Sequence, residues 1–156
     1  FIMEELNINY RAIYPSEEER KQTSFRKISP TGLIPVLVTP KDVSIFESLA
    51  IIIHLIETYP NENMIAPIGS PSRARCWQWL SYIATTLYTV NLRYLYPEKF
   101  GNPDIVKSIA EESRRQCYDL MENEVEEFLS GNKISAADYY FYMVMDWDDE
   151  KEIVFQ

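Results

Sequence analysis

Two short stretches of this sequence carry residues that can bind a small peptide. The first is Ile34-Pro35, which follows the turn sequence Ser29-Pro30-Thr31-Gly32. Because a residue before proline is forced to be extended, Ile34 can offer its backbone N–H and C=O groups to a peptide. The second is Glu47-Ser48, which opens an amphipathic run. A helix that starts there directs free N–H groups and its positive dipole end at a carboxylate or phosphate. Together they predict a pocket for a small peptide with a free carboxylate.

The elements that must position these residues are a β-hairpin and a helix. Pro35 has no N–H, so it should stand at the head of a strand over 36–39 rather than inside it. Pro40-Lys41-Asp42 predicts a turn, and residues 43–46 predict the second strand. A helix is expected over 49–59. On these residues alone, a purely structural role for Glu47 and Ser48 as a helix cap remains open.

The residues before this hairpin give weaker signals. Residues 1–6 predict the end of a helix, and residues 8–14 alternate enough to predict a strand. Residues 17–28 are polar and charged, which predicts a helix of weak apolar character or an irregular segment. The order is therefore helix end, strand, helix, strand, strand and helix.

The second half of the sequence predicts helices only. Pro60 and the Asn- and Gly-containing stretch to Gly69 indicate a linker. Ser70-Pro71 and Asn102-Pro103 each combine an N-cap residue with proline at the first helical position. The first helix is expected to run to about residue 93, and the second carries an apolar face as far as Phe128 and ends at Gly131.

The sharpest local motif is Ser135-Ala136-Ala137-Asp138, a capping box that opens a helix running to about Trp147. In this motif Ser135 is the N-cap and Asp138 folds back from the third helical position. We assign both residues a folding role and not a catalytic one.

Composition excludes several classes of function. The chain has 156 residues and 46% hydrophobic residues, enough for a real core in one domain or two small ones. A net charge of -9 argues against nucleic acid and against an anionic membrane surface. The longest apolar run is far shorter than the roughly 20 residues of a membrane-spanning helix. Cys76 and Cys117 are far apart in sequence, which predicts buried free thiols in a reducing compartment, here the cytoplasm.

In order and spacing, these features resemble the cytosolic glutathione S-transferase family of bacterial type. The resemblance covers the chain from Phe1 to Trp147. Within this range, the segments Trp77–Tyr82 and Tyr96–Phe100 resemble the first helix of the family's helical domain. It implies an α+β thioredoxin-like domain over residues 1–60, a linker over 61–69 and an all-α helical domain over 70–156. It further implies that the first strand is missing from the start of the chain and that its end is incomplete.

The resemblance also implies a function. Ile34 and Pro35 would pair with the cysteinyl backbone of glutathione, the co-substrate, and Glu47 and Ser48 would hold its γ-glutamyl end. The expected enzyme is a homodimeric transferase that joins the glutathione thiol to a small, apolar electrophile, without a metal, as in detoxification. The family's thiol-activating Ser, Tyr or Cys would lie before Phe1, so no catalytic residue is assigned.

Two alternatives remain open at this point. The first is a non-catalytic protein of the same fold that serves as a protein-interaction or transcription-associated module. The second is a glutathione-dependent disulfide reductase or isomerase, because a Ser, Cys or Tyr at the thiol steers the chemistry.

Overall fold

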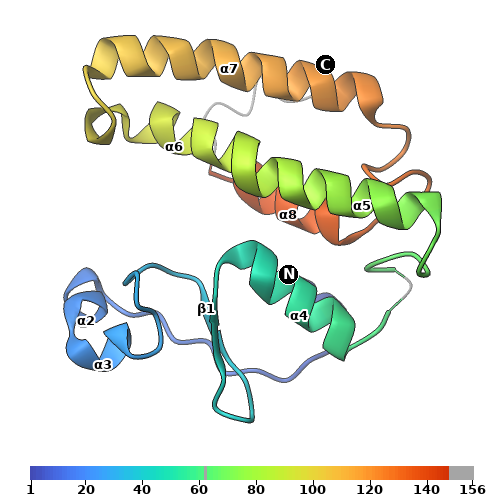
Figure 1. The fold of residues 1–156 in the computed structure, drawn as a ribbon, viewed down its shortest axis with the longest axis horizontal. Coiled ribbons are helices and arrows are strands. Elements are labelled where there is room, and N and C mark those ends of the chain that lie inside the picture. Colours follow the sequence, from blue (N-terminus) through green and yellow to red (C-terminus); the bar gives the residue numbers. More distant parts are fainter. Residues whose placement is uncertain (62, 148–156) are drawn as a thin grey trace. The chain divides into compact units, whose positions relative to one another are not determined.

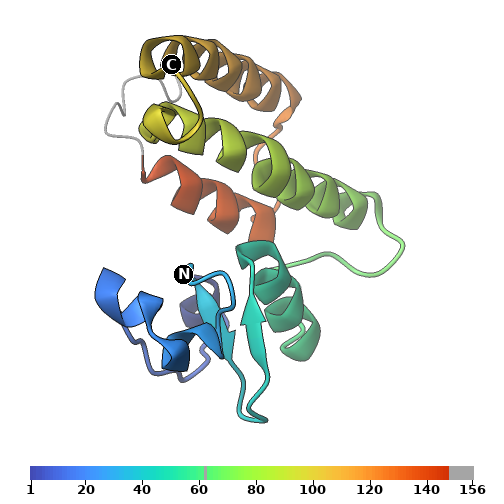
Figure 2. The same ribbon diagram turned by 60° about the vertical axis from the view of Figure 1, so that its left-hand side comes forward.

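The computed structural model describes residues 1–61 and 63–147 and divides into two compact units, Phe1–Asn61 and Glu62–Gln156. The first unit combines helices with a two-stranded sheet, and the second contains helices joined by loops (Figures 1 and 2). The elements of the first unit are α1 Ile2–Glu5, α2 Glu17–Lys21, α3 Thr23–Arg26, β1 Val36–Val38, β2 Ser44–Phe46 and α4 Ser48–Thr58.

The centre of the first unit is the hairpin of β1 and β2 with α4 packed beside it (Figure 2). The strands are antiparallel, with Val36 opposite Phe46. Helix α4 contacts both strands and α1, and buries Ile52, Leu55 and Ile56. The prediction of two strands followed by a helix is confirmed, and each boundary lies within one residue of its expected place.

The predicted strand over residues 8–14 is wrong. The structure has no regular element there, and the side chains of Ile13 and Tyr14 are 71% and 91% exposed. A strand is held by ladder hydrogen bonds to a neighbour. Within the described residues the only ladder of strands joins β1 to β2, so the alternating pattern finds no partner.

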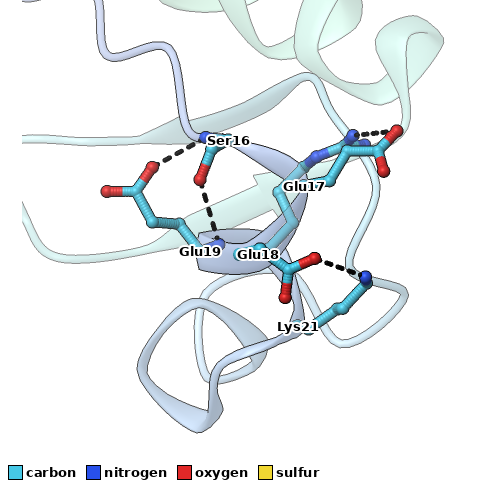
Figure 3. A network of polar contacts seen from close by, with 6 residues as sticks. Ser16, Glu17, Glu18, Glu19 and Lys21 are labelled. Carbon is cyan, nitrogen blue, oxygen red and sulfur yellow. Dashed lines mark hydrogen bonds and ion pairs between the residues drawn. The ribbon is translucent and has the colours of Figure 1, made fainter.

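The predicted helix over 17–28 is two short helices, α2 and α3, separated by the extended residue Gln22. A capping box opens α2, as Figure 3 shows. The N–H of Glu19 donates to Ser16 Oγ at 3.2 Å, and the N–H of Ser16 donates to the Glu19 carboxylate at 2.7 Å. This bond from the Ser16 backbone holds the pKa of Glu19 below its usual value. Local capping, and not a buried face, therefore maintains α2, which has no buried residue.

In the second unit one long helix runs against two others (Figure 1). Its segments are α5 Pro71–Tyr82, the π-helical turn η1 Ile83–Leu87 and α6 Tyr88–Leu95. The 3-10 turn η2 Pro97–Lys99, α7 Pro103–Glu124 and α8 Ala136–Met145 follow. Sequence periodicity predicted one uniform helix over 71–93 and did not reveal the π-helical turn.

Helix α7 lies antiparallel to the long helix. Near one end the Arg75 guanidinium reaches the backbone carbonyl of Glu124 at 2.7 Å, and near the other Arg114 Nε donates to Asn91 Oδ1 at 3.1 Å. Helix α8 packs on α5. The core between these helices is formed by Cys76, Trp79, Leu80, Ile83, Leu87, Cys117, Met121, Tyr140 and Val144.

Both cysteines are buried free thiols, as predicted. Cys117 lies beside Tyr82 of α5, and burial, followed by a hydrogen bond with the Cys117 thiol, raises the pKa of the Tyr82 phenol. This contact joins α5 to α7.

The Asp138 carboxylate organises the start of α8. It accepts hydrogen bonds from the N–H of Ser135 at 2.8 Å, the hydroxyl of Ser135 at 2.8 Å and the N–H of Leu129 at 2.9 Å. The Ser135 proton is used in this way, so the neighbouring hydroxyl of Ser130, at 2.8 Å, must be its donor. A single carboxylate thereby connects α8 to the loop before it.

This network also corrects the predicted end of α7. The helix ends at Glu124, and Phe128 and Gly131 form an isolated bridge instead of a last helical turn. The chain leaves the helical path at Val125, which is extended, and further along the N–H of Leu129 bonds to Asp138. The apolar spacing that reached Phe128 could not reveal this competing acceptor.

We predict that Asp138→Ala lowers the free energy of unfolding by about 2–4 kcal/mol, because Ser135 and Leu129 lose a charged acceptor. Chemical denaturation at neutral pH measures this change. The control is Asp119→Ala, which removes an exposed carboxylate and should shift stability by no more than about 0.5 kcal/mol. Equal stabilities of the two variants would refute the role of Asp138.

We also predict a stability difference at alkaline pH. The folded protein raises the pKa of Tyr82 above that of the unfolded chain, so the unfolded chain loses its proton first. Stability linked to Tyr82 is therefore complete below about pH 10 and falls as the pH rises above it. Denaturation at pH 8 and pH 11 gives the free energy of unfolding at each pH. Between these pH values it should fall less for Tyr82→Phe than for the wild type. An equal loss in both would contradict the assignment.

Candidate peptide-ligand site

The hairpin brings the four predicted site residues to one place within the first unit. Val36 pairs with Phe46. Pro35 precedes Val36 and Glu47 follows Phe46, so Ile34-Pro35 and Glu47-Ser48 leave the same end of the hairpin. Paired strands lie about 4.8 Å apart. A ligand of a few residues can therefore reach both stretches.

Ile34 presents an unbonded backbone. Its side chain is 52% exposed, and its peptide bond to Pro35 is cis. Among the described residues, neither its N–H nor its C=O makes a hydrogen bond. Both groups therefore have no bond within the described residues that a peptide ligand would have to displace.

The first turn of α4 is open as well. Glu47 precedes it with φ of 71°, a left-handed conformation that is uncommon for a residue with a Cβ. Its side chain makes no hydrogen bond to the helix. The first N–H to bond within this turn is that of Ile51, to the carbonyl of Glu47. The N–H groups of Ser48, Leu49 and Ala50 thus have no capping side chain.

Other long helices of the chain are closed at the same place. Ser70 accepts from the N–H of Arg73 at 3.2 Å at the start of α5, and Asn102 accepts from Ile105 at 3.3 Å at the start of α7. The alternative that Glu47 acts as an ordinary side-chain cap therefore does not describe α4. The exposed carboxylate of Glu47 carries a negative charge. The free N–H groups of α4 that follow it form the positive end of the helix dipole, so opposite charges lie side by side here.

The remaining chemistry-bearing residues lie elsewhere. His54, the only histidine, lies on α4 and is half-buried. In the part of the chain that the structure describes, no three His, Cys, Asp or Glu side chains gather as a metal site would require. A cavity of about 70 Å³ in the second unit, between Cys76, Ser130 and Ser135, is too small for a peptide. No helix within residues 1–61 and 63–147 has the length and apolar character to cross a bilayer.

Sequence reasoning missed two features of the site. No signal in the sequence revealed the positive φ of Glu47. The second is Ser29, which is completely buried and bonded to the carbonyl of Leu33 at 2.8 Å, directly before Ile34. Its presence in a Pro- and Gly-containing turn was visible, but not its burial.

The comparisons with known proteins cover different parts of the chain. Residues 1–63 match the family model described as glutathione S-transferase, N-terminal domain. Glutathione S-transferase GstA from Escherichia coli O157:H7 is 28% identical over 123 residues, which are 77% of this chain and 59% of the relative. Glutathione S-transferase D6 from Drosophila melanogaster is 30% identical over 123 residues, 77% of this chain and 56% of the relative. The chain thus spans less than two thirds of the length of these relatives.

Solved structures show the same fold. A glutathione transferase from Methylococcus capsulatus has a TM-score of 0.83 at 23% identity, over 94% of this chain and 73% of that one. A glutathione transferase homologue from Sulfitobacter, solved with bound glutathione, has a TM-score of 0.82 at 19% identity, over 94% and 74%.

The predicted fold class is thereby confirmed: a thioredoxin-like unit, here with a two-stranded sheet, precedes a helical unit. The family model, the curated relatives and the solved structures all point to the glutathione S-transferase family.

Proposed function

We propose that this protein binds glutathione in the first unit and transfers its thiol to a small electrophile. The observation that carries the proposal is the pairing of an unbonded Ile34 backbone with the uncapped start of α4 at one end of a hairpin. Relatives named glutathione S-transferase and a neighbour solved with glutathione support the same ligand.

The polar groups of glutathione match these features in kind. Its γ-glutamyl end carries an ammonium and a carboxylate. The Glu47 carboxylate suits the ammonium, and the hydroxyl of Ser48 with the free N–H groups of α4 suits the carboxylate. The cysteinyl residue carries an N–H and a C=O, which suit the C=O and N–H of Ile34 in the manner of an added strand.

The chemistry of transfer requires the thiolate. The sulfur of the deprotonated thiol attacks an electrophilic carbon, and the bond to the leaving group breaks as the new C–S bond forms. The proposed site binds the backbone of glutathione and thereby places the glutathione thiol at high effective concentration beside the electrophile. No residue of this chain is assigned to lowering the pKa of the thiol.

We predict that Glu47→Ala weakens the binding of reduced glutathione about tenfold or more, and that Ser48→Ala weakens it several-fold, because each loses a charged or charge-assisted partner. Alanine keeps the Cβ of Glu47, so the cost of its positive φ is unchanged. Calorimetric titration of the full-length protein measures the dissociation constants. Conjugation of glutathione to a panel of aryl halides and epoxides measures turnover.

The matched control is Glu57→Ala, at the other end of α4, where an exposed glutamate makes no described contact. Its affinity for glutathione should stay within twofold of the wild type. Unchanged affinity in both site variants would refute the site. A wild type that binds glutathione but conjugates none of the electrophiles would contradict the transferase and favour a non-catalytic or disulfide-exchanging protein.

We further propose the domain limits 1–60 and 70–156 with a linker between them, and a homodimer. Support for the homodimer comes from α7, where Ile105, Ile109 and Leu120 lie along one helical stripe and are 61%, 62% and 44% exposed. A second copy of the chain would remove this apolar stripe from water.

We predict that Ile109→Glu shifts the protein toward the monomer, because a charge would be buried in the interface. Sedimentation velocity over a range of concentrations should show a dissociation constant at least about tenfold higher. The control is Ser108→Glu, which adds the same charge to the face of α7 that also carries Glu111 and Asp119. A monomeric wild type, or equal effects of the two variants, would refute this interface.

A further inference from the structure

The loop that leads to Ile34 is built around one buried hydroxyl. Ser29 is 0% exposed, and its Oγ donates to the carbonyl of Leu33 at 2.8 Å. Thr31 Oγ1 lies 3.3 Å from Ser29 Oγ and accepts from the N–H of Leu33 at 3.3 Å. The one proton of Ser29 goes to Leu33, so Thr31 donates to Ser29. Both backbone polar groups of Leu33 are therefore held by side chains of the same loop.

Further contacts restrain the loop. The N–H of Gly32 donates to the carbonyl of Ser29 at 2.9 Å, and an Arg26 guanidinium N–H donates to the carbonyl of Pro30 at 3.0 Å. Gly32 has φ of 69°, and a Cβ there would lie 2.5 Å from Arg26 Cζ. The turn is therefore fixed by specific bonds.

The fixed carbonyl of Leu33 determines where the next N–H points. The peptide bond between Leu33 and Ile34 is trans and planar, so the carbonyl of Leu33 and the N–H of Ile34 point in opposite directions. Since the carbonyl points at the buried Ser29, the N–H of Ile34 points away from it. That N–H makes no hydrogen bond within the described residues.

We propose that Ser29 is a positioning residue for ligand binding: its hydroxyl aims the N–H of Ile34 at the peptide backbone of the ligand. The inference rests on the proposed glutathione site and adds a residue that does not itself touch the ligand. A donor held in its bound orientation loses less freedom on binding, so pre-orientation appears as affinity. Without Ser29, the Leu33–Ile34 peptide can rotate, and the carbonyl of Leu33 loses a buried donor.

The test is calorimetric titration of the full-length protein with reduced glutathione, which gives stoichiometry and affinity separately. We expect Ser29→Ala to raise the dissociation constant roughly three- to tenfold, the value of about one hydrogen bond, at unchanged stoichiometry. Thr31→Val removes the second hydroxyl, which lies at an exposed position. This variant should raise the dissociation constant to a smaller degree. This second variant does not disturb a buried side chain and keeps the test valid if Ser29→Ala folds poorly.

The matched control is Ser16→Ala, which destabilises the same unit by removing the capping box of α2. A purely structural effect lowers the melting temperature and the fraction of binding-competent protein, but not the affinity of that fraction. Ser16→Ala should therefore melt earlier and bind glutathione as tightly as the wild type.

The outcomes separate the inference from the proposed function. A wild type that binds glutathione, with Ser29→Ala and Thr31→Val binding equally well, overturns the role of Ser29 and leaves the glutathione site intact. A loss of affinity in Ser16→Ala equal to that in Ser29→Ala also overturns it. A wild type that does not bind glutathione overturns the proposed function, and the inference with it.

Discussion

The candidate site depends on the antiparallel pairing of β1 and β2. The pairing of Val36 with Phe46 places the residues before one strand beside the residues after the other. A shift of one strand by one residue would turn its side chains to the opposite face and would move Ile34 relative to the start of α4. The apolar face of α4, which packs on both strands, opposes such a shift. Packing of α4 on both strands thus supports the register on which the site rests.

The helix termini of this protein differ according to their role. At α5, α7 and α8 a side chain within the element or just before it satisfies the first turn, and these helices form the core of the second unit. At α4 the first turn is left open and the preceding glutamate has an unfavourable φ. Uncapped N–H groups and a strained residue both cost stability. The first unit bears this cost at the place where the proposed ligand would satisfy the free groups.

Polar side chains give the loops of both units their shape. Asp138 directs the chain after α7, and Ser29 directs the chain before Ile34. In each case a side-chain oxygen bonds to a backbone group several residues away. This bond, and not the neighbouring helix or strand, fixes the path of the loop. After α7 ends at Glu124, the path of the chain through Leu129 is set by such a bond and not by the apolar pattern, which continues to Phe128.

The sequence by itself determined the hairpin, α4 and the capped helices, because proline, turn residues, N-caps and apolar spacing act within a few positions of one another. Only the tertiary structure decided that residues 8–14 form no strand, that α7 ends early, that Glu47 has a positive φ and that Ser29 is buried. The physical reason is that a strand needs a partner, and a buried hydroxyl or carboxylate selects its bond from groups that the fold brings together. No local pattern contains those partners.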